Sequence, residues 1–185
     1  SSSFMARFTA EADNDLVVNT GLQFLGGHPA TFIADQSCNQ TGTLTVTSLG
    51  SVSTTDSVLT IEAADLSLLG TINSGSVSTN INVCPGVSVD VGGLGNTITG
   101  QMRVSRAELQ KITSTNLTFT SRSANITVYE TTLDDTTSIT EKIKFNAYLN
   151  LKFRETSVFK SIFGVAHSID LVADIKTEEN FHLKA

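Results

Sequence analysis

Tryptophan is absent from this 185-residue sequence, proline occurs only twice, and charged residues make up only 16% of the chain. The formal net charge is -6 and the pI is about 4.9, so the sequence offers no basic surface for nucleic acid or anionic lipid. No apolar run approaches the roughly 18 residues that cross a bilayer, so we expect no membrane span. The remaining composition, rich in Ser, Thr and small aliphatic residues, is typical of a β-rich chain with a weakly charged exterior.

Cysteine is also scarce. The two cysteines, Cys38 and Cys84, are too far apart for a CxxC redox or zinc motif. The pair favours one disulfide in an oxidising environment, and two unpaired buried thiols are the alternative. Three Asn-x-Ser/Thr triplets make Asn39, Asn116 and Asn125 candidates for N-glycosylation. Together these features favour an extracellular or cell-surface protein.

The sequence lacks the usual catalytic and metal-binding motifs. The histidines His28, His167 and His182 are scattered, and none has a partner at metal-ligand spacing. There is no Gly-x-Ser-x-Gly elbow, and neither cysteine has a neighbouring histidine. The glycine-rich segment 91–100 fits neither the dinucleotide-binding pattern nor the phosphate loop, and we interpret it as a turn. The sequence therefore predicts no catalytic, cofactor-binding or metal-binding residue.

Acidic residues form local groups at 13–15 and at 134–135. Calcium ligation at Asp13 and Asp15 would need several converging oxygens, and the glycine and spacing of an EF-hand are missing, so a solvated turn is favoured. Paired carboxylates of a polysaccharide-cleaving enzyme stay open as an alternative, although no local pattern indicates them.

Up to about residue 140 the sequence is a succession of short β-type segments. They alternate apolar with polar residues and are separated by Gly, Asn and Ser. Their spacing suits a sandwich, a barrel or a solenoid equally, so internal repeats must decide between these folds. The expected strands are 15–20, 30–35, 43–49, 57–64, 76–83, 87–92, 102–107, 116–121 and 125–130.

An internal repeat favours the solenoid. Residues 59–66 align with residues 102–109 at a constant offset of about 43 residues, roughly twice the length of one β-helical coil. Aligned residues are therefore expected to share one wall of the solenoid, two coils apart, and each coil buries its apolar ring against its neighbours. Asp65 and Glu108 fall at equivalent positions, which indicates that both lie where a coil bends.

After residue 140 the pattern changes. The stretch EKIKFNAYLNLKFRE (141–155) alternates strictly and predicts one strand of about eleven residues in an antiparallel sheet with one solvated face. We expect residues 1–140 to form the solenoid, with 1–14 as an N-terminal arm or cap, and residues 141–185 to form a capping or subunit-docking element.

The two ends of such a solenoid would expose unpaired strand edges, which invite stacking unless they are covered. An apolar arm can complete the sheet of a neighbour. We therefore expect a homo-oligomer or homopolymer formed through the ends. The candidate subunit contacts are Phe4 and Phe8 near the N-terminus and Phe145 and Phe153 in the C-terminal element.

Three segments resemble the haemagglutinin-like repeats of large secreted adhesins: LTIEAADLSLLGTINSG (59–75), INVCPGVSVDVGG (81–93) and MRVSRAELQKITSTNLTFTSRSANITV (102–128). The resemblance, of the filamentous-haemagglutinin type, extends over about residues 40–130. It implies a right-handed parallel β-helix that is exported and displayed outside the cell.

Our expectation is therefore an all-β fold, a right-handed parallel β-helix with a C-terminal antiparallel element. The expected function is that of a non-enzymatic extracellular structural or adhesive protein, with a subunit of a self-assembling surface fibre as a specific variant. A cell-surface glycan or protein is a candidate partner. The alternatives are a polysaccharide-cleaving β-helix enzyme and a carbohydrate-binding module, the latter weakened by the lack of tryptophan and the presence of only two tyrosines.

Overall fold

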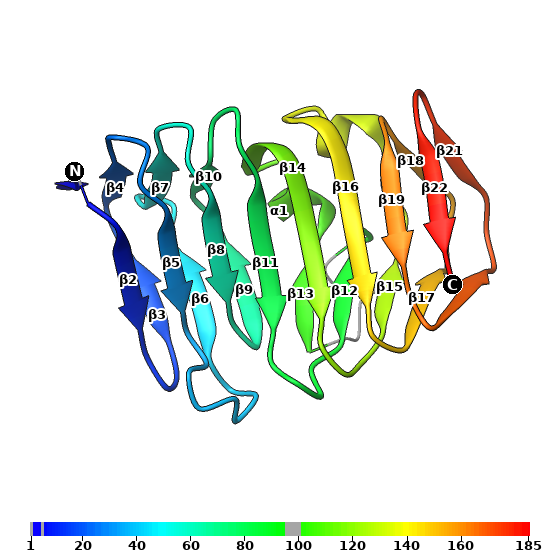
Figure 1. Cartoon of the computed structure of the whole chain (residues 1–185), viewed down its shortest axis with the longest axis horizontal. Helices are drawn as coiled ribbons and strands as arrows, with labels where there is room; N and C mark the ends of the chain where they lie inside the picture. The colour runs from blue at the N-terminus through cyan, green and yellow to red at the C-terminus, as the bar shows by residue number, and fades with distance from the viewer. Residues whose placement is uncertain (1, 5, 95–100) are drawn as a thin grey trace.

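The computed structural model describes residues 2–4, 6–94 and 101–185, except for the side chain of Phe4. The chain is mostly β-strand, and its strands form curled sheets stacked along one long axis, with the two termini at opposite ends (Figure 1). Every ladder between described strands is parallel. No helix in the described ranges is long and apolar enough to cross a membrane.

Apart from one separate pair, the described strands fall into three ladders that the chain visits in turn, so that neighbours in a ladder are commonly three strands apart in sequence. The first ladder comprises β1 (Ser2–Phe4), β4 (Gly21–Phe24), β7 (Ser51–Thr54), β10 (Thr71–Asn73) and the start of β14 (Ile112–Ser121). The second ladder comprises β2 (Phe8–Glu11), β5 (Ala30–Ile33), β8 (Leu59–Glu62), β11 (Thr79–Val83), the rest of β14, β16 (Ile139–Ala147), β19 (Ile162–Val165) and β22 (Phe181–Lys184). The long strand β14 joins these two ladders into one twelve-stranded sheet.

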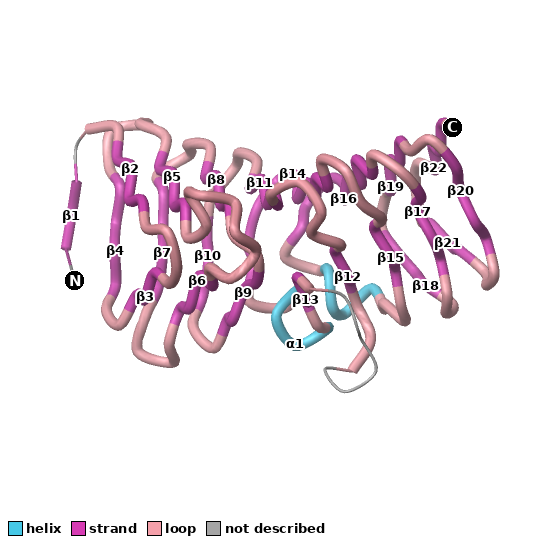
Figure 2. Tube along the Cα trace, turned by 90° about the horizontal axis from the view of Figure 1, so that it is seen from below, coloured by secondary structure: helices cyan, strands magenta, loops and turns pink. Residues whose placement is uncertain are grey.

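The third ladder has two parts. One part comprises β3 (Leu16–Val18), β6 (Thr43–Val46) and β9 (Asp65–Leu68), and the other comprises β13 (Met102–Val104), β12 (Val89–Val91), β15 (Ile126–Val128), β17 (Asn150–Phe153) and β20 (Ser168–Leu171). A separate pair consists of β18 (Ser157–Phe159) and β21 (Ile175–Thr177). Figure 2 shows the same progression from below, with the short helix α1 (Arg106–Leu109) beside β13. A 3-10 turn, η1, spans Leu133–Thr136.

The interior is filled by side chains that stack from strand to strand. The register places Ile61 beside Ile81, Ile81 beside Phe119 and Phe119 beside Phe145. All four side chains are buried, and the rings of Phe119 and Phe145 stack with centroids 5.8 Å apart. Because alternate residues of a strand point to opposite faces, one apolar residue in two is enough to fill this core.

The order of β12 and β13 reverses their order in sequence. Strand β13 lies between β9 and β12, so β12 is placed one strand position further along the third ladder than β13, which follows it in the sequence. Of the predicted turn at 91–100, residues 95–100 lie outside the described residues. Carboxylates bridge the β9–β13 junction. Asp65 Oδ1 accepts from the backbone N–H of Arg103 (3.0 Å), and Glu108 Oε1 accepts from that of Leu68 (3.1 Å). Glu108 also closes a capping box with Ser105 at the start of α1.

The prediction that residues 59–66 and 102–109 share one wall of the solenoid is wrong. Leu59 and Ile61 belong to β8 in the second ladder, whereas Met102 and Val104 belong to β13 in the third. The ladder partner of Leu59 is Ala30 on one side and Thr79 on the other. An alternating apolar pattern distinguishes inside from outside, but it is the same on every wall, so self-similarity could not distinguish one ladder from another.

The predicted antiparallel element after residue 140 is also wrong. Strands β16, β19 and β22 extend the second ladder, and β17 and β20 extend the third, all in parallel. The predicted long strand breaks at Tyr148 and Leu149, both exposed, between β16 and β17. A two-residue corner preserves the period of two, so the alternation continues around the bend without marking it.

Candidate functional site: the open ends and a cross-linked corner

The last strands carry core-type side chains that nothing in the described chain covers. The register stacks Ile169 on Leu151 and Leu171 on Phe153. Leu151 and Phe153 are fully buried, whereas Leu171 is 55% exposed. An apolar side chain at the same inward position is therefore buried where a further strand follows and exposed where the described ladder ends.

The second ladder ends in the same way. Phe181 of β22 stacks on buried Ile162 but is itself 51% exposed. Leu183 stacks on Gly164, where a side chain would collide with both Leu151 and Leu183, so the glycine makes room for this last apolar layer. A hollow of about 370 Å³ is lined by Leu171 of β20, Ile175 of β21, Phe181 of β22 and the residues between β20 and β21. We call this surface the C-terminal end face, made by Ile169, Leu171, Ile175, Phe181 and Leu183.

The opposite end shows the complementary surface. Phe8 of β2 is half-buried against Phe24 and Phe32, with ring centroids 4.8 and 5.6 Å away. Ala10 and Leu16 are half-buried as well. Strand β2 has β5, and β3 has β6, as its one ladder partner among the described strands. Phe8, Ala10 and Leu16 form what we call the N-terminal end face.

The predicted subunit contacts need correction in the C-terminal half. Phe145 and Phe153 are 0% exposed and pack edge-to-face with centroids 6.3 Å apart, so neither ring has a surface to offer a second chain. Phe8 does lie at an end, and the side chain of Phe4 is outside the described part. Sequence reasoning missed Leu171 and Phe181. Their signal was their place in SIDL and FHLK, the alternating segments that form the last described strands of their ladders.

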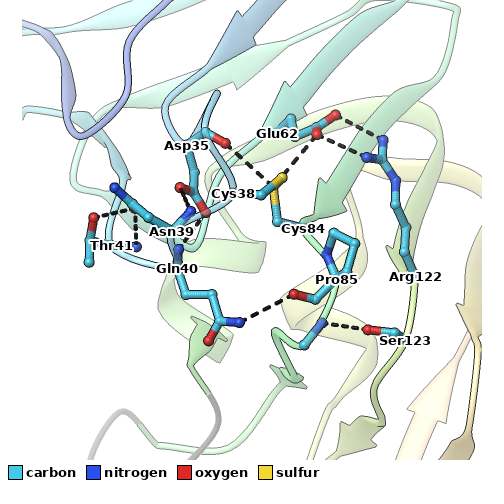
Figure 3. Close-up of a disulfide and its surroundings, with 11 residues drawn as sticks. Asp35, Cys38, Asn39, Gln40, Thr41, Glu62, Cys84, Pro85, Arg122 and Ser123 are labelled. Atoms are coloured by element: carbon cyan, nitrogen blue, oxygen red, sulfur yellow. Dashed lines mark hydrogen bonds and ion pairs between the residues drawn. A yellow bond between two sulfur atoms is a disulfide. The ribbon is translucent and has the colours of Figure 1, made fainter.

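A disulfide joins Cys38 to Cys84, as the sequence predicted, with the Cα atoms 5.3 Å apart (Figure 3). Cys38 follows β5 and Cys84 follows β11, and β8 lies between these two strands in the second ladder. The bond therefore connects two turns of chain across an intervening one. Glu62 places a carboxylate oxygen near both sulfurs, within 4.8 Å. Because the sulfurs are bonded to each other, neither is the thiolate that binds a metal.

The turn that presents Cys38 is organised by a buried carboxylate. Asp35 Oδ1 accepts from the N–H of Asn39 (2.9 Å), and Oδ2 accepts from the N–H of Gln40 (3.1 Å). Cys38 and Gln40 both have positive φ, at 52° and 68°, a backbone region that side chains rarely adopt. The hydrogen bonds to Asp35 hold this turn, and so they place Cys38 over its partner.

A second clamp lies beside the disulfide (Figure 3). Arg122, just after β14, donates two parallel hydrogen bonds to Glu62 of β8, at 3.0 and 2.9 Å. Strand β11 lies between β8 and β14 in the ladder, so this ion pair also spans one intervening strand. The disulfide and the ion pair therefore each connect two turns of chain that are separated by one intervening strand of the second ladder.

A buried ion pair fastens α1 to η1. Asp135 is 1% exposed, and its Oδ2 accepts from Arg106 Nε (2.7 Å) and from the N–H of Thr132 (2.8 Å), while its Oδ1 accepts from Gln110 (2.8 Å). Burial alone would raise the pKa of Asp135, but the hydrogen bonds from Thr132, Gln110 and Arg106 outweigh it and hold that pKa below its ordinary value. With both oxygens occupied by donors, this carboxylate is a structural anion.

The other residues singled out in the sequence lie apart from one another. Asp15 Oδ1 accepts from the N–H of Thr43 (2.9 Å) and so serves a turn. His182 stacks on Phe163 with ring centroids 5.0 Å apart, whereas His28 and His167 are exposed. The described ranges therefore do not bring the histidines together.

The three sequons differ in accessibility. Asn39 is exposed, and its Oδ1 accepts from Thr41. Asn116 is half-buried and its Nδ2 donates to Glu141 (3.2 Å), which occupies the nitrogen that would carry a sugar. Asn125 is half-buried, and its Oδ1 accepts from Asn150. Asn39 is thus the sequon best placed for glycosylation, which stays a prediction at all three positions.

Comparison with known proteins gives no match to this chain among family models, curated proteins or solved structures. The likeness to haemagglutinin-type repeats therefore rests on the sequence segments alone.

Proposed function

We propose that this chain is a right-handed parallel β-helix that serves outside the cell as a non-enzymatic structural or adhesive module. The observation that carries the proposal is the second ladder. It runs in parallel from β2 to β22 without a break among the described strands, and stacked buried side chains line its inner face. A chain built this way acts through its length, stiffness and repeated outer surface. Right-handedness is the expected hand because crossover connections between parallel strands are right-handed in the great majority of sheets.

Two further features support the proposal. The disulfide and the Glu62–Arg122 ion pair each join strands that are not neighbours, which opposes local bending and separation of the layers. A disulfide persists in oxidising surroundings and is rare in the reducing cytosol, which favours an exported protein.

Surface labelling tests this proposal. Antibodies against the purified chain should label intact, non-permeabilised source cells, and protein recovered from the cell surface should contain no free thiol. Labelling only after permeabilisation, with both cysteines reduced, would contradict it. Depolymerisation assays on uronic-acid polymers should show no release of sugar, and activity there would establish the enzymatic alternative instead.

Glycan binding is a second candidate function, favoured by one row of side chains. Ladder register aligns outward-facing hydroxyl and amide groups at the strand spacing of about 4.8 Å. The row comprises Thr9, Thr31, Thr60, Asn80 and Thr118. Such a periodic surface suits a polymer with a regular repeat. Pull-down with insoluble polysaccharides tests it: the wild type should bind, a Thr60→Val/Thr118→Val variant should bind less, and equal binding by both would exclude this row.

A further inference from the structure

We propose that the C-terminal end face of one copy binds the N-terminal end face of a second copy, so that the parallel ladders continue from chain to chain. The inference rests on the proposed structural function and names its partner, which is the same protein. Strand β22 of one copy would pair with β2 of the next, and β20 would pair with β3.

The parallel topology makes the two ends complementary in direction. Among the described strands, β2 is the first and β22 the last of the second ladder, and the strands between them all run the same way. A second copy shifted along the long axis therefore presents β2 to β22 in the same orientation as every internal neighbour. The N–H and C=O groups that point away from β5 on β2 and away from β19 on β22 can then continue the ladder.

The side chains match if the internal register continues across the junction. Inward-facing Phe181 and Leu183 would then stack on inward-facing Phe8 and Ala10. On the third ladder Ile169 would stack on Leu16. The exposed apolar surface of Leu171 and Phe181 would become buried in this arrangement, as Phe153 and Ile162 are buried inside the chain. The occupant that fits is therefore another apolar layer of the same kind.

Charge supports the same register. The outward-facing Lys184 of β22 would lie opposite the outward-facing Glu11 of β2, and opposite charges facing each other across strands are favourable. Arg7, just before β2, would lie opposite Asn180, next to Glu179. In chain direction, the N-terminal edge therefore carries a positive and then a negative side chain, Arg7 and Glu11. The C-terminal edge carries a negative and then a positive one, Glu179 and Lys184. All four charged side chains are exposed, so their contribution is to orientation and register more than to affinity.

Cross-linking of single-cysteine variants tests the direction and the register. Glu11→Cys and Lys184→Cys are surface changes, and the two native cysteines are already bonded to each other. Mixing the two variants under mild oxidation should give a disulfide-linked heterodimer, and neither variant alone should link to itself. A mixture of Thr60→Cys, in the middle of the second ladder, with Lys184→Cys is the matched control and should not link. Self-linked homodimers would overturn the head-to-tail arrangement.

Charge exchange and sedimentation complete the test. Wild-type protein should show concentration-dependent association in sedimentation velocity. The Leu171→Asp variant, changed at an exposed position, should stay monomeric and keep the circular dichroism spectrum of the wild type. Glu11→Lys should weaken association, and mixing Glu11→Lys with Lys184→Glu should restore it, which a folding defect would not allow. A wild type that stays monomeric up to about millimolar concentration overturns the stacking, including the case in which other chain segments cover this face. Surface labelling of intact cells remains an independent test of the proposed function.

Discussion

Breaking the Cys38–Cys84 bond should cost more stability than any other change at this corner. The two cysteines are 46 residues apart. In the chain-entropy model a cross-link closing a loop of this length removes enough freedom from the unfolded chain to stabilise the fold by about 4 kcal/mol. Because Cys84 is buried and Cys38 is half-buried, we expect the folded state to keep both side chains near their present positions when the bond is reduced.

Guanidinium unfolding followed by circular dichroism measures the effect. Oxidised wild type is compared with wild type in reductant and with Cys38→Ala/Cys84→Ala. Wild type in reductant and the double-alanine variant should each lose about 2–4 kcal/mol of unfolding free energy relative to the oxidised wild type. Their m-values should rise, because the unfolded chain without the cross-link exposes more surface. If the unfolding free energies of reduced wild type and the double-alanine variant agree, the loss comes from the missing covalent bond and not from the packing of the sulfur atoms.

The neighbouring ion pair is the matched control. Arg122→Ala removes a link of similar reach between partly solvated charges, since the side chains of Arg122 and Glu62 are 45% and 19% exposed, and should cost about 1 kcal/mol. If oxidised and reduced wild type unfold within about 0.5 kcal/mol of each other, the span of this disulfide across an intervening turn has no energetic role and the reasoning is refuted.

Three further outcomes are expected. Phe145→Ala should lower the unfolding free energy by about 3–5 kcal/mol, because it empties a fully buried site, whereas exposed Tyr148→Ala should change it by less than about 0.5 kcal/mol; equal effects in chemical denaturation would contradict the assigned core. The lowered pKa of Asp135 contributes stability above its unfolded pKa of about 4, and this contribution is lost as the pH falls through the folded pKa. Asp135→Asn should therefore be less stable than wild type at pH 7, with the gap narrowing below about pH 4 in thermal melts, and a gap independent of pH would show that the carboxylate is not a stabilising anion. In a glycosylating host, Asn39→Gln should remove one glycan from the intact mass, while Asn116→Gln should leave the mass of the glycans unchanged; the reverse pattern would contradict the accessibility of these side chains.

The sequence predicted what depends on alternation and on single residue types. Strand segments such as 57–64 and 125–130 contain the observed β8 and β15, because one apolar residue in two marks a half-buried strand. The disulfide followed from there being just two cysteines. Both predictions depend on residue type and local alternation, which do not change with the position of the strand in a ladder.

Features that depend on which strands are neighbours could not be predicted in this way. The offset that aligned Leu59 with Met102 compared strands of different ladders, because every wall presents the same alternation. The corner at Tyr148 and Leu149 was hidden because two turn residues preserve the period. The reversed order of β12 and β13 is topological, and its trace in the sequence is the pair of carboxylates, Asp65 and Glu108, that bridge the junction.

Candidate site residues were hardest to predict where function depends on the end of a ladder. Phe145 and Phe153 were selected because they alternate on a strand, yet two further strands cover them. Leu171 and Phe181 carry the same pattern and are open because the described ladder ends beside them. Whether an inward-facing residue is core or surface is a property of the stack, which a local pattern does not contain.

The most direct test of the account is the distance between the two ends of the second ladder. Seven successive pairings lead from Glu11 to Lys184 in one outward-facing row. At about 4.8 Å per strand a straight parallel stack separates their Cα atoms by about 34 Å. Pulsed electron spin resonance between nitroxides on Glu11→Cys/Lys184→Cys, diluted with unlabelled protein, should give one narrow distance consistent with that span. A much shorter distance, as in a sheet curled back on itself, or a broad distribution would contradict the straight parallel stack.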